Sequence, residues 1–334
     1  MKKAAYIGLF IIVALALGFM FGPKAPEPHL DPDPISIPIA IDSLEGWVAH
    51  RESGFKTLKP GNEAELVWLN DSVQKTTYAV VYLHGFTASK AEGGTLHRDF
   101  SKRYGCNLYL PRLYGHGLDT TNALIDLTPE NYLQSAKEAI AIGKKMGEKV
   151  ILMCTSTGAT LGLYLAAHDP AIESIICYSP NIDIYDPNSK FLTGPWGLQL
   201  VRLVMGSDFR SYDAEAEYKK YWQTHYRIEG LVAVRSLLDA TMTKETFSQI
   251  HQPVFVAAYF KDEGHQDKTV SVEAMRQMMP LLATSDNKKR MVEFPNVDAH
   301  VMTSPLTSKD VESVKVETYR FAEQVIGLST AVSP

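Results

Sequence analysis

The sequence predicts an α/β protein with a mostly parallel central sheet flanked by helices. Three observations carry this prediction. Short apolar runs such as Thr77–Leu83 read as strands buried on both faces. These runs alternate with stretches of helical periodicity, and strands that alternate with helices form parallel sheets covered on both faces. Finally, 334 residues with 45% apolar content are enough to bury one large core.

The expected elements follow one another along the chain. Strand-like runs surround a Pro-Gly turn within residues 54–70, ahead of the buried run Thr77–Leu83. The later expected strands are Cys106–Pro111, Lys149–Cys154, Ser174–Ser179, Pro253–Phe260 and Met291–Phe294. Apolar positions at helical spacing predict helices that end near Tyr104 or span Pro129–Met146 and Thr157–His168.

A segment from about 183 to 250 interrupts this alternation. It has helical periodicity throughout and is rich in aromatic residues, namely Phe191, Trp196, Tyr218, Tyr221, Trp222 and Tyr226. We expect an inserted helical cap. Its aromatic side chains either form the core of the cap or line an apolar substrate pocket.

The first 22 residues differ in kind from the rest. Lys2 and Lys3 precede an uninterrupted apolar run, Ala4–Gly22, whose length as a helix comes close to the roughly 30 Å of a bilayer's hydrocarbon. The run leads into no small-x-small cleavage site, which favours an uncleaved N-terminal transmembrane helix over a cleaved secretory signal. A buried helix of the fold is a third reading.

Flanking lysines favour a cytoplasmic N-terminus, so the bulk of the chain is expected on the non-cytoplasmic side, either periplasmic or extracellular. If the signal is cleaved, the protein is secreted instead. The predicted organisation is a membrane anchor at 1–22, a stiff Pro-rich spacer at 23–45 and an α/β domain at 46–330 that contains the cap.

Charge and cysteine content narrow the function classes. A net charge of −5 with interspersed signs leaves no basic face for a phosphate backbone, so nucleic acid is not an expected partner. Three cysteines, Cys106, Cys154 and Cys177, lie at or beside apolar runs, which indicates buried free thiols and not a disulfide framework.

The stretch MCTSTGAT, Met153–Thr160, places Ser156 between an expected strand and an expected helix. A serine on such a turn projects its hydroxyl above the sheet edge, and the next backbone N–H, that of Thr157, points to where an acyl oxyanion forms. Cys154 stands where such turns usually carry glycine. A helix N-cap serine is the alternative interpretation.

Other segments supply partners for this serine in the order Ser, Asp, His. LHGFTAS follows a buried strand, so the N–H of Phe86 is a second candidate oxyanion donor. His300 lies in a loop after the last strand. Asp262 follows a strand end and is the first choice of acid, with Asp267 and Glu263 as alternatives in the same loop.

From about Thr77 to Gly327 the chain resembles the α/β-hydrolase superfamily, in particular its capped branch of monoacylglycerol lipases, carboxylesterases and serine-aminopeptidase-like hydrolases. The resemblance rests on the HG-Phe loop, the YGHG segment Tyr114–Gly117, the serine turn, the acid after a strand and the histidine loop. It implies a triad of Ser156, Asp262 and His300, with an oxyanion hole formed by the amides of Phe86 and Thr157.

These features predict a serine hydrolase that cleaves carboxylic esters, with lipid-like or acylglycerol substrates favoured. A serine aminopeptidase is the alternative within hydrolases, since Glu215, Glu217 and Glu229 of the cap offer charge for a free amine. A catalytically inactive, membrane-tethered binding module of the same fold is a further alternative. We expect no cofactor, and no histidines and carboxylates have metal-ligand spacing.

Overall fold

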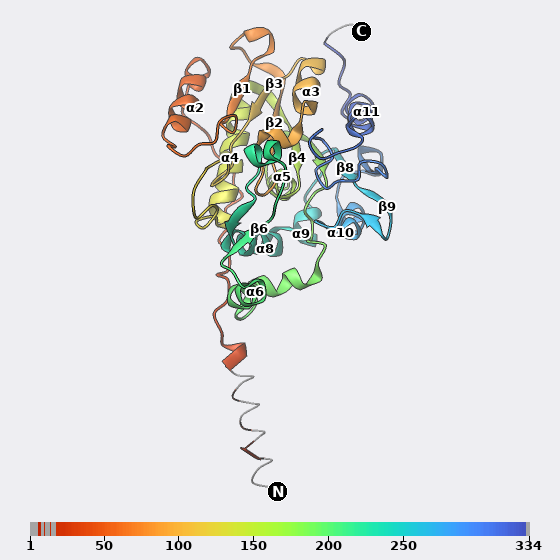
Figure 1. Cartoon of the computed structure of the whole chain (residues 1–334). Coiled ribbons are helices and arrows are strands. Elements are labelled where there is room, and N and C mark those ends of the chain that lie inside the picture. The colour runs from red at the N-terminus through yellow and green to blue at the C-terminus, as the bar shows by residue number, and fades with distance from the viewer. Residues whose placement is uncertain (1–5, 8–9, 11–13, 15–17, 332–334) are drawn as a thin grey trace.

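A computed structural model describes residues 6–7, 10, 14 and 18–331 of the chain (Figure 1). A seven-stranded sheet forms its centre, in the order β1-β3-β2-β4-β5-β8-β11. Its strands are β1 (Glu65–Val67), β2 (Thr76–Leu83), β3 (Asn107–Leu110), β4 (Gly147–Thr155), β5 (Ile172–Tyr178), β8 (Val254–Ala258) and β11 (Lys289–Glu293). Only the β1–β3 pairing within this sheet is antiparallel. The predicted mostly parallel sheet is therefore confirmed.

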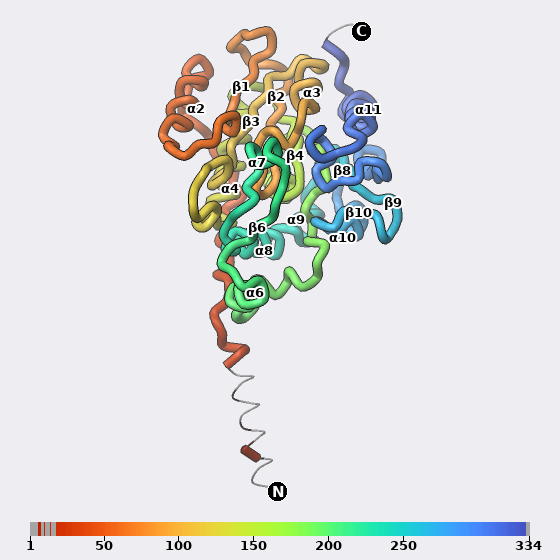
Figure 2. The backbone as a smooth tube through the Cα atoms, in the orientation of Figure 1, coloured from red at the N-terminus to blue at the C-terminus, as the bar shows by residue number. Residues whose placement is uncertain are grey.

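Helices cover both faces of the sheet. The larger apolar core includes side chains from α2 (Leu44–Ser53), α4 (Pro129–Met146), α5 (Thr157–Ala166), α8 (Glu229–Thr241) and α10 (Val272–Met278). The opposite core includes side chains from α3 (Leu96–Tyr104) and α11 (Val311–Phe321), which lie side by side in Figures 1 and 2. This two-faced covering explains why the central strands are apolar on both sides.

Helix α4 shows how local sequence sets an element that packs on the sheet. Thr128 and Asn131 form a capping box, and Pro129 occupies the first turn, where its missing N–H costs no hydrogen bond. Gly143 lets the helix approach β2, since a methyl group there would lie 2.4 Å from a Val81 methyl. The predicted bounds, Pro129–Met146, match the observed ones.

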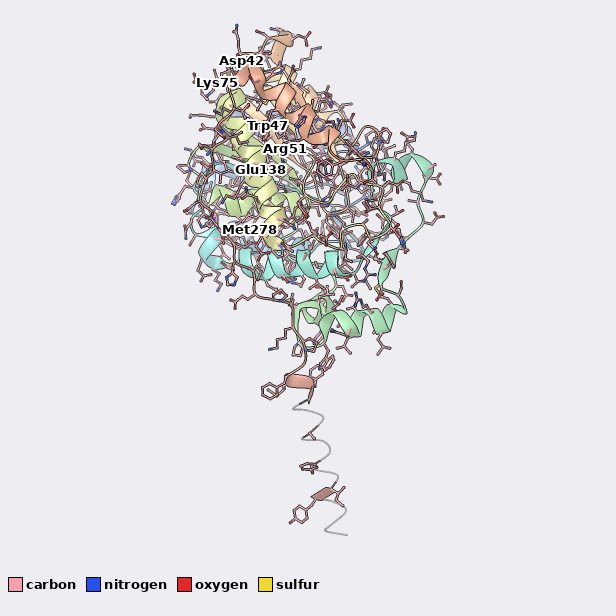
Figure 3. All side chains as sticks on the ribbon, turned by 90° about the vertical axis from the view of Figure 1, so that its left-hand side faces the viewer. Asp42, Trp47, Arg51, Lys75, Glu138 and Met278 are labelled. Carbon is pink, nitrogen blue, oxygen red and sulfur yellow. The ribbon has the colours of Figure 1, made fainter. Side chains whose placement is uncertain are left out.

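Helix α2 packs along the outer side of α4, as Figure 3 shows. Arg51 of α2 lies over the ring of Trp47 and forms an ion pair with Glu138 of α4 at 2.8 Å. The region ahead of α2 differs from the expected stiff spacer, because it lies along the body of the protein. The ammonium of Lys137, itself buried, contacts both the carboxylate and the backbone oxygen of Asp31.

The cap is partly β-structure. After β5 come the 3₁₀ turn Pro187–Thr193, α6 (Gly197–Met205), β6 (Phe209–Ser211), α7 (Ala216–Tyr221), β7 (His225–Arg227), α8 and α9 (Lys244–Phe247). The hairpin of β6 and β7 was not expected. Across it, Phe209 stacks on His225 at 4.4 Å and lies under the Arg227 guanidinium, so aromatic cross-strand packing stabilises two very short strands.

Two further expectations met different outcomes. Residues 54–70 were expected to hold strands on both sides of a turn, but the structure has only β1 and an isolated bridge at Leu58. Most of the apolar run Ala4–Gly22, on which the predicted anchor depends, lies outside the described residues. Within the described ranges, no helix combines the length and apolar character needed to cross a bilayer.

Candidate active site

Ser156 occupies a strained turn between β4 and α5. It is the single residue between the two elements, and its φ of 53° and ψ of −121° lie in a region that non-glycine residues rarely adopt. Its N–H donates to the Tyr178 carbonyl and its carbonyl accepts from the Asn181 N–H, so the turn is tied to the end of β5. This conformation lifts the hydroxyl above the sheet edge.

Two glycines allow α5 to lie close to the sheet beneath this turn. A methyl group on Gly158 would lie 2.1 Å from the Leu83 carbonyl oxygen, which leaves no room for a side chain. A methyl group on Gly162 would lie 2.8 Å from the Cys154 sulfur. The fully buried thiol therefore occupies space that the missing Gly162 side chain leaves free, which explains how cysteine fits where glycine is usual. Cys106, Cys154 and Cys177 are all buried free thiols, as predicted.

The two expected oxyanion donors lie at the same edge of the sheet. Thr157 is the first residue of α5, so its N–H has no partner within the helix. Gly85, the residue before Phe86, packs against the turn of Ser156, because a methyl group on it would lie 3.0 Å from Cβ of Ser156. Among the described residues, neither the Thr157 amide nor the Phe86 amide donates to a protein acceptor.

His84 braces the Phe86 loop from below. Its Nε2 accepts from the Leu113 N–H at 3.1 Å, which places the ring proton on Nδ1, where it donates to the Gly85 carbonyl. Burial lowers the pKa of His84 to about 4, so the ring is neutral at physiological pH. Both ring nitrogens of His84 are thus occupied by backbone groups, and the residue shapes the loop.

His300 is held by a carboxylate on one side and by the sheet on the other. Its Nδ1 lies 2.6 Å from Oδ2 of Asp267, and its carbonyl accepts from the Ser179 hydroxyl at 2.7 Å. Ser179 directly follows Tyr178, the residue that anchors Ser156. The serine turn and the histidine loop are thus fixed to consecutive residues at the end of β5.

The acid expected first, Asp262, is not the partner of His300. Its carboxylate accepts from the N–H of Gly264 and from both the N–H and the ring Nδ1 of His265, on the exposed surface. The predicted strand Pro253–Phe260 extended past the observed end of β8. β8 ends at Ala258, and β9 (Phe260–Asp262) pairs with β10 (His265–Gln266) in a small hairpin that projects at the edge near α10 (Figure 2).

This hairpin returns the chain to the strand end at Asp267, whose N–H donates to the Tyr259 carbonyl. Asp267, an alternative in the sequence analysis, thereby takes the position expected of Asp262. Glu263, the other alternative, accepts from Gln266 within the hairpin. The correction comes from strands of three and two residues that no periodicity in the sequence marks.

Burial and charge tune the acid and the imidazole in opposite directions. Burial would raise the pKa of Asp267, but the charge and hydrogen bond of His300 and the N–H groups of Thr269 and Val270 lower it below its usual range. Burial would lower the pKa of His300, but the charge and hydrogen bond of Asp267, with a further contribution from Glu92, raise it. The pair is therefore arranged to stabilise an imidazolium.

The cap encloses the site with aromatic side chains. Tyr226 packs edge-on against Phe86 at 5.3 Å, and Trp222 stacks on Tyr218 at 4.3 Å. Trp222 also joins Ala88 and Val301 in a small buried cluster. Ser156 is 6% exposed as a result. Phe191 and Trp196 differ, since both lie toward the surface.

The sequence analysis missed one residue at this site, Glu92. Its side chain is buried and accepts a hydrogen bond from the N–H of Gly85 at 2.6 Å. Nothing in its local sequence distinguishes it from a surface glutamate, since it lies in a polar stretch between two glycine-containing loops.

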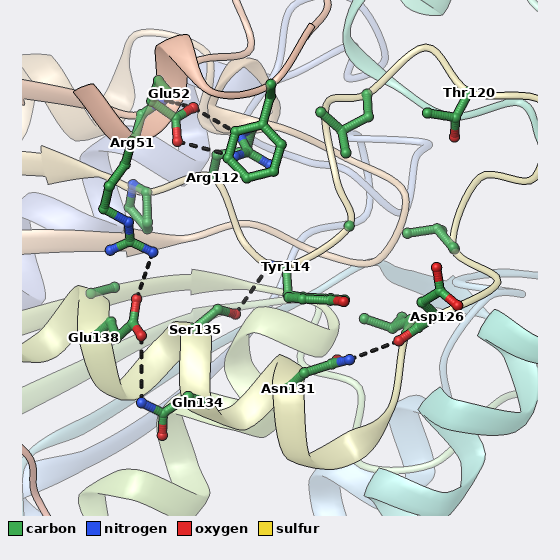
Figure 4. Close-up of a pocket in the computed structure, with 18 of the residues that line it drawn as sticks. Arg51, Glu52, Arg112, Tyr114, Thr120, Asp126, Asn131, Gln134, Ser135 and Glu138 are labelled. Carbon is green, nitrogen blue, oxygen red and sulfur yellow. Dashed lines mark hydrogen bonds and ion pairs between the residues drawn. The ribbon is translucent and has the colours of Figure 1, made fainter. Parts of the chain in front are cut away.

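A large cavity of about 830 Å³ lies apart from these residues, between α2, α4 and the loop after β3 (Figure 4). Ion pairs of Arg51 with Glu138 and of Arg112 with Glu52 cross its wall. Neither Ser156 nor His300 lines it. The side chains of Ser135 and Asn131 in Figure 4 bond to nearby backbone, and the cavity is separate from the residues described above.

Comparisons with known proteins agree with this fold. The model of a family described as the alpha/beta hydrolase family matches residues 80–310. A thermostable monoacylglycerol lipase from Bacillus sp. (strain H-257) is 30% identical over 142 residues, which cover 42% of this chain and 56% of the lipase. The match thus spans little more than half the length of that relative.

Solved structures share the fold at low sequence identity. A metagenome-derived lipolytic enzyme, from work on LipS and LipT, superposes with a TM-score of 0.60 at 16% identity, covering 79% of this chain and 98% of that one. A monoacylglycerol lipase from Paleococcus ferrophilus gives a TM-score of 0.57 at 14% identity, covering 80% of this chain and 98% of that one.

Proposed function

Because the chain belongs to the alpha/beta hydrolase family, we propose that it is a serine hydrolase that cleaves carboxylic esters through an acyl-enzyme intermediate. The observation that carries this proposal is that the strained turn of Ser156 and the loop of the Asp267–His300 pair are fixed to the consecutive residues Tyr178 and Ser179. The monoacylglycerol lipase relative and the lipolytic structural neighbours support an ester-cleaving hydrolase.

In the proposed mechanism, Nε2 of His300 accepts the Ser156 proton as the serine oxygen attacks the ester carbonyl. Asp267 holds Nδ1–H and stabilises the imidazolium that forms. The amides of Phe86 and Thr157 bind the oxyanion. The imidazolium then protonates the leaving alcohol, and a water molecule repeats the cycle on the acyl-enzyme.

Lipid-like esters are the substrate class that we propose. The aromatic cap over Phe86 supplies an apolar enclosure suited to an acyl chain, with Tyr226 and Trp222 closest to the two site loops. Two of the three cap carboxylates on which the peptidase alternative depends are already paired. Glu229 is paired with Arg202 and Arg227, and Glu217 with Lys220, so neither of these two offers a free charge for an amine.

We also propose that the protein works beside a membrane, on its non-cytoplasmic side. The N–H of Trp196 donates to the Pro23 carbonyl and its indole to the Gly18 carbonyl, so the end of the apolar N-terminal run lies against the start of α6. Leu203 and Val204 of α6 are 77% and 86% exposed. Figure 3 shows α6 at the end of the body from which the N-terminal segment emerges.

Fluorophosphonate labelling tests the reaction class. The full-length protein should be modified at Ser156, as identified by peptide mass spectrometry, and should hydrolyse nitrophenyl acyl esters. Ser156→Ala should abolish labelling and lower kcat by several orders of magnitude. An unlabelled Ser156 in an active preparation would assign the chemistry to another group. Faster turnover of amino-acid nitroanilides than of esters would favour the peptidase.

A further inference from the structure

Glu92 is a buried carboxylate that the proposed mechanism does not use. It lies in the 3₁₀ turn Lys90–Gly93 and is 2% exposed. Its Oε2 accepts from the Gly85 N–H at 2.6 Å and from the Tyr82 hydroxyl at 3.3 Å. Its backbone carbonyl accepts from the Thr303 hydroxyl at 2.8 Å. The side chain therefore joins β2 to the loop that contains Gly85 and Phe86 (the oxyanion loop), and the backbone of the same residue contacts the segment after His300.

The geometry puts Glu92 directly behind the reacting groups. Gly85 lies between Glu92 and Ser156, because a methyl group there would lie 2.9 Å from Oε1 of Glu92 and 3.0 Å from Cβ of Ser156. The hydrogen bond to the Gly85 N–H fixes the residue immediately before Phe86, whose N–H is an expected oxyanion donor. A small displacement at Gly85 would move that donor away from the oxyanion.

A buried carboxylate needs a compensating charge to stay ionised. The Gly85 N–H and the Tyr82 hydroxyl each supply one hydrogen bond, and the positive charge available nearby is that of His300 once protonated. Burial raises the pKa of Glu92 to about 7, while those groups oppose the rise. In turn, the Glu92 charge helps to raise the pKa of His300.

We propose that Glu92 is a positioning residue that holds the oxyanion loop through Gly85 and places a second negative charge, beside that of Asp267, where it stabilises the His300 imidazolium. This inference rests on the proposed function. The two roles depend on different properties of the side chain. A neutral hydrogen-bond acceptor can hold the loop, but only a charged carboxylate can stabilise the imidazolium.

The other titratable groups around Glu92 do not change their charge near neutral pH. Tyr82 of β2, Tyr132 of α4 and Tyr218 of α7 all feel its charge, and burial raises the pKa of each well above the physiological range, so all three stay neutral. His97 packs against Tyr82, and burial lowers its pKa to about 4. Near neutral pH the titrating groups of this cluster are thus Glu92 itself and His300, each of which affects the pKa of the other.

Glu92→Gln and Glu92→Ala in the full-length protein separate the two tasks. Glutamine keeps an oxygen for the Gly85 N–H but removes the charge, so kcat should fall about 10-fold with little change in KM. The acid limb of kcat/KM should move to lower pH by about half a unit, because the His300 pKa falls. Alanine also removes the acceptor, and kcat should fall about 100-fold.

Glu65→Gln is the matched control. Glu65 is a carboxylate paired with Lys90 of the same 3₁₀ turn and with Arg98, and its loss should leave the acid limb in place. If Glu92→Gln and Glu92→Ala both have the kcat and acid limb of Glu65→Gln, Glu92 only fills space and the inference is wrong. If wild-type Ser156 resists the fluorophosphonate probe, the proposed function itself fails, so the two failures are distinguishable.

Discussion

The carboxylate of Asp267 binds His300 through one oxygen and the backbone through the other. Oδ2 lies 2.6 Å from Nδ1 of His300, while Oδ1 accepts from the N–H groups of Thr269 and Val270. With both oxygens occupied and the side chain buried, the carboxylate cannot rotate away from the imidazole. It therefore fixes one tautomer of His300, with the proton on Nδ1 and Nε2 free to accept.

Asp267→Asn should lower kcat by about 10³- to 10⁴-fold, because the amide can favour the wrong imidazole tautomer and cannot stabilise the imidazolium. Asp262→Asn is the matched control, since it alters an exposed carboxylate of the adjoining hairpin and should leave kcat within about twofold. Steady-state ester hydrolysis measures both. The reverse ranking of the two variants would restore Asp262 as the acid.

The pH dependence of kcat/KM should show an acid limb whose midpoint lies above the ordinary histidine pKa of about 6.5. Although burial opposes the charged ring, the charge and hydrogen bond of Asp267 raise the pKa of His300. Only the neutral ring can accept the serine proton, so activity falls as pH drops through that raised value. A limb centred below pH 6 in the wild-type enzyme would contradict the arrangement of charges.

Cys154 and Gly162 should be coupled in stability. Gly162→Ala places a methyl group against the Cys154 sulfur and should reduce the free energy of unfolding by about 1–3 kcal/mol. Cys154→Gly opens that space, so the double variant should be more stable than the sum of the single changes implies, by about 1 kcal/mol or more. Urea unfolding of the four proteins gives the coupling energy. Additive losses would show that the two sites do not share this space.

Leu203→Glu and Val204→Glu should lower the hydrolysis of esters in a lipid surface without affecting that of soluble esters. Both positions are highly exposed, so folding should change by less than about 0.5 kcal/mol. A charge on this face opposes burial in a lipid surface, and hydrolysis of a long-chain ester in vesicles should fall about 10-fold. Turnover of a short soluble nitrophenyl ester should not change.

Val316→Glu on α11 provides the control for these two variants, because Val316 is also an exposed apolar residue but lies on the face covered by the other set of helices. It should leave both activities unchanged. Equal effects of all three substitutions in the vesicle assay would contradict the proposal that α6 faces the membrane.

Elements with strong local signals were predictable from the sequence. The capping residue Thr128, the Pro129 at the helix start and a long amphipathic pattern define α4 to its observed ends. The strand β4 and the turn at Ser156 were equally clear, because a buried apolar run leads directly into a helical one. Ser156, His300 and the two amides lie at one sheet edge because the carboxyl ends of parallel strands share that edge.

The acid and Glu92 depended on packing that local sequence does not encode. Asp262 and Asp267 lie five residues apart in one polar loop, and only the pairing of β9 with β10 decides which of them returns to the strand end. The burial of Glu92 likewise results from contacts with Tyr82 and Gly85 across the sheet edge. Short strands and side-chain hydrogen bonds leave no periodic trace in a single sequence.

The buried cluster of Trp222, Ala88 and Val301 has a consequence for substrate entry. Trp222 belongs to the cap, Ala88 follows the loop that carries one amide donor, and Val301 is the neighbour of the imidazole. A cap movement that separated Trp222 from this cluster would expose apolar surface of Ala88 and Val301 to water. Substrate entry by that route would therefore disturb both loops together.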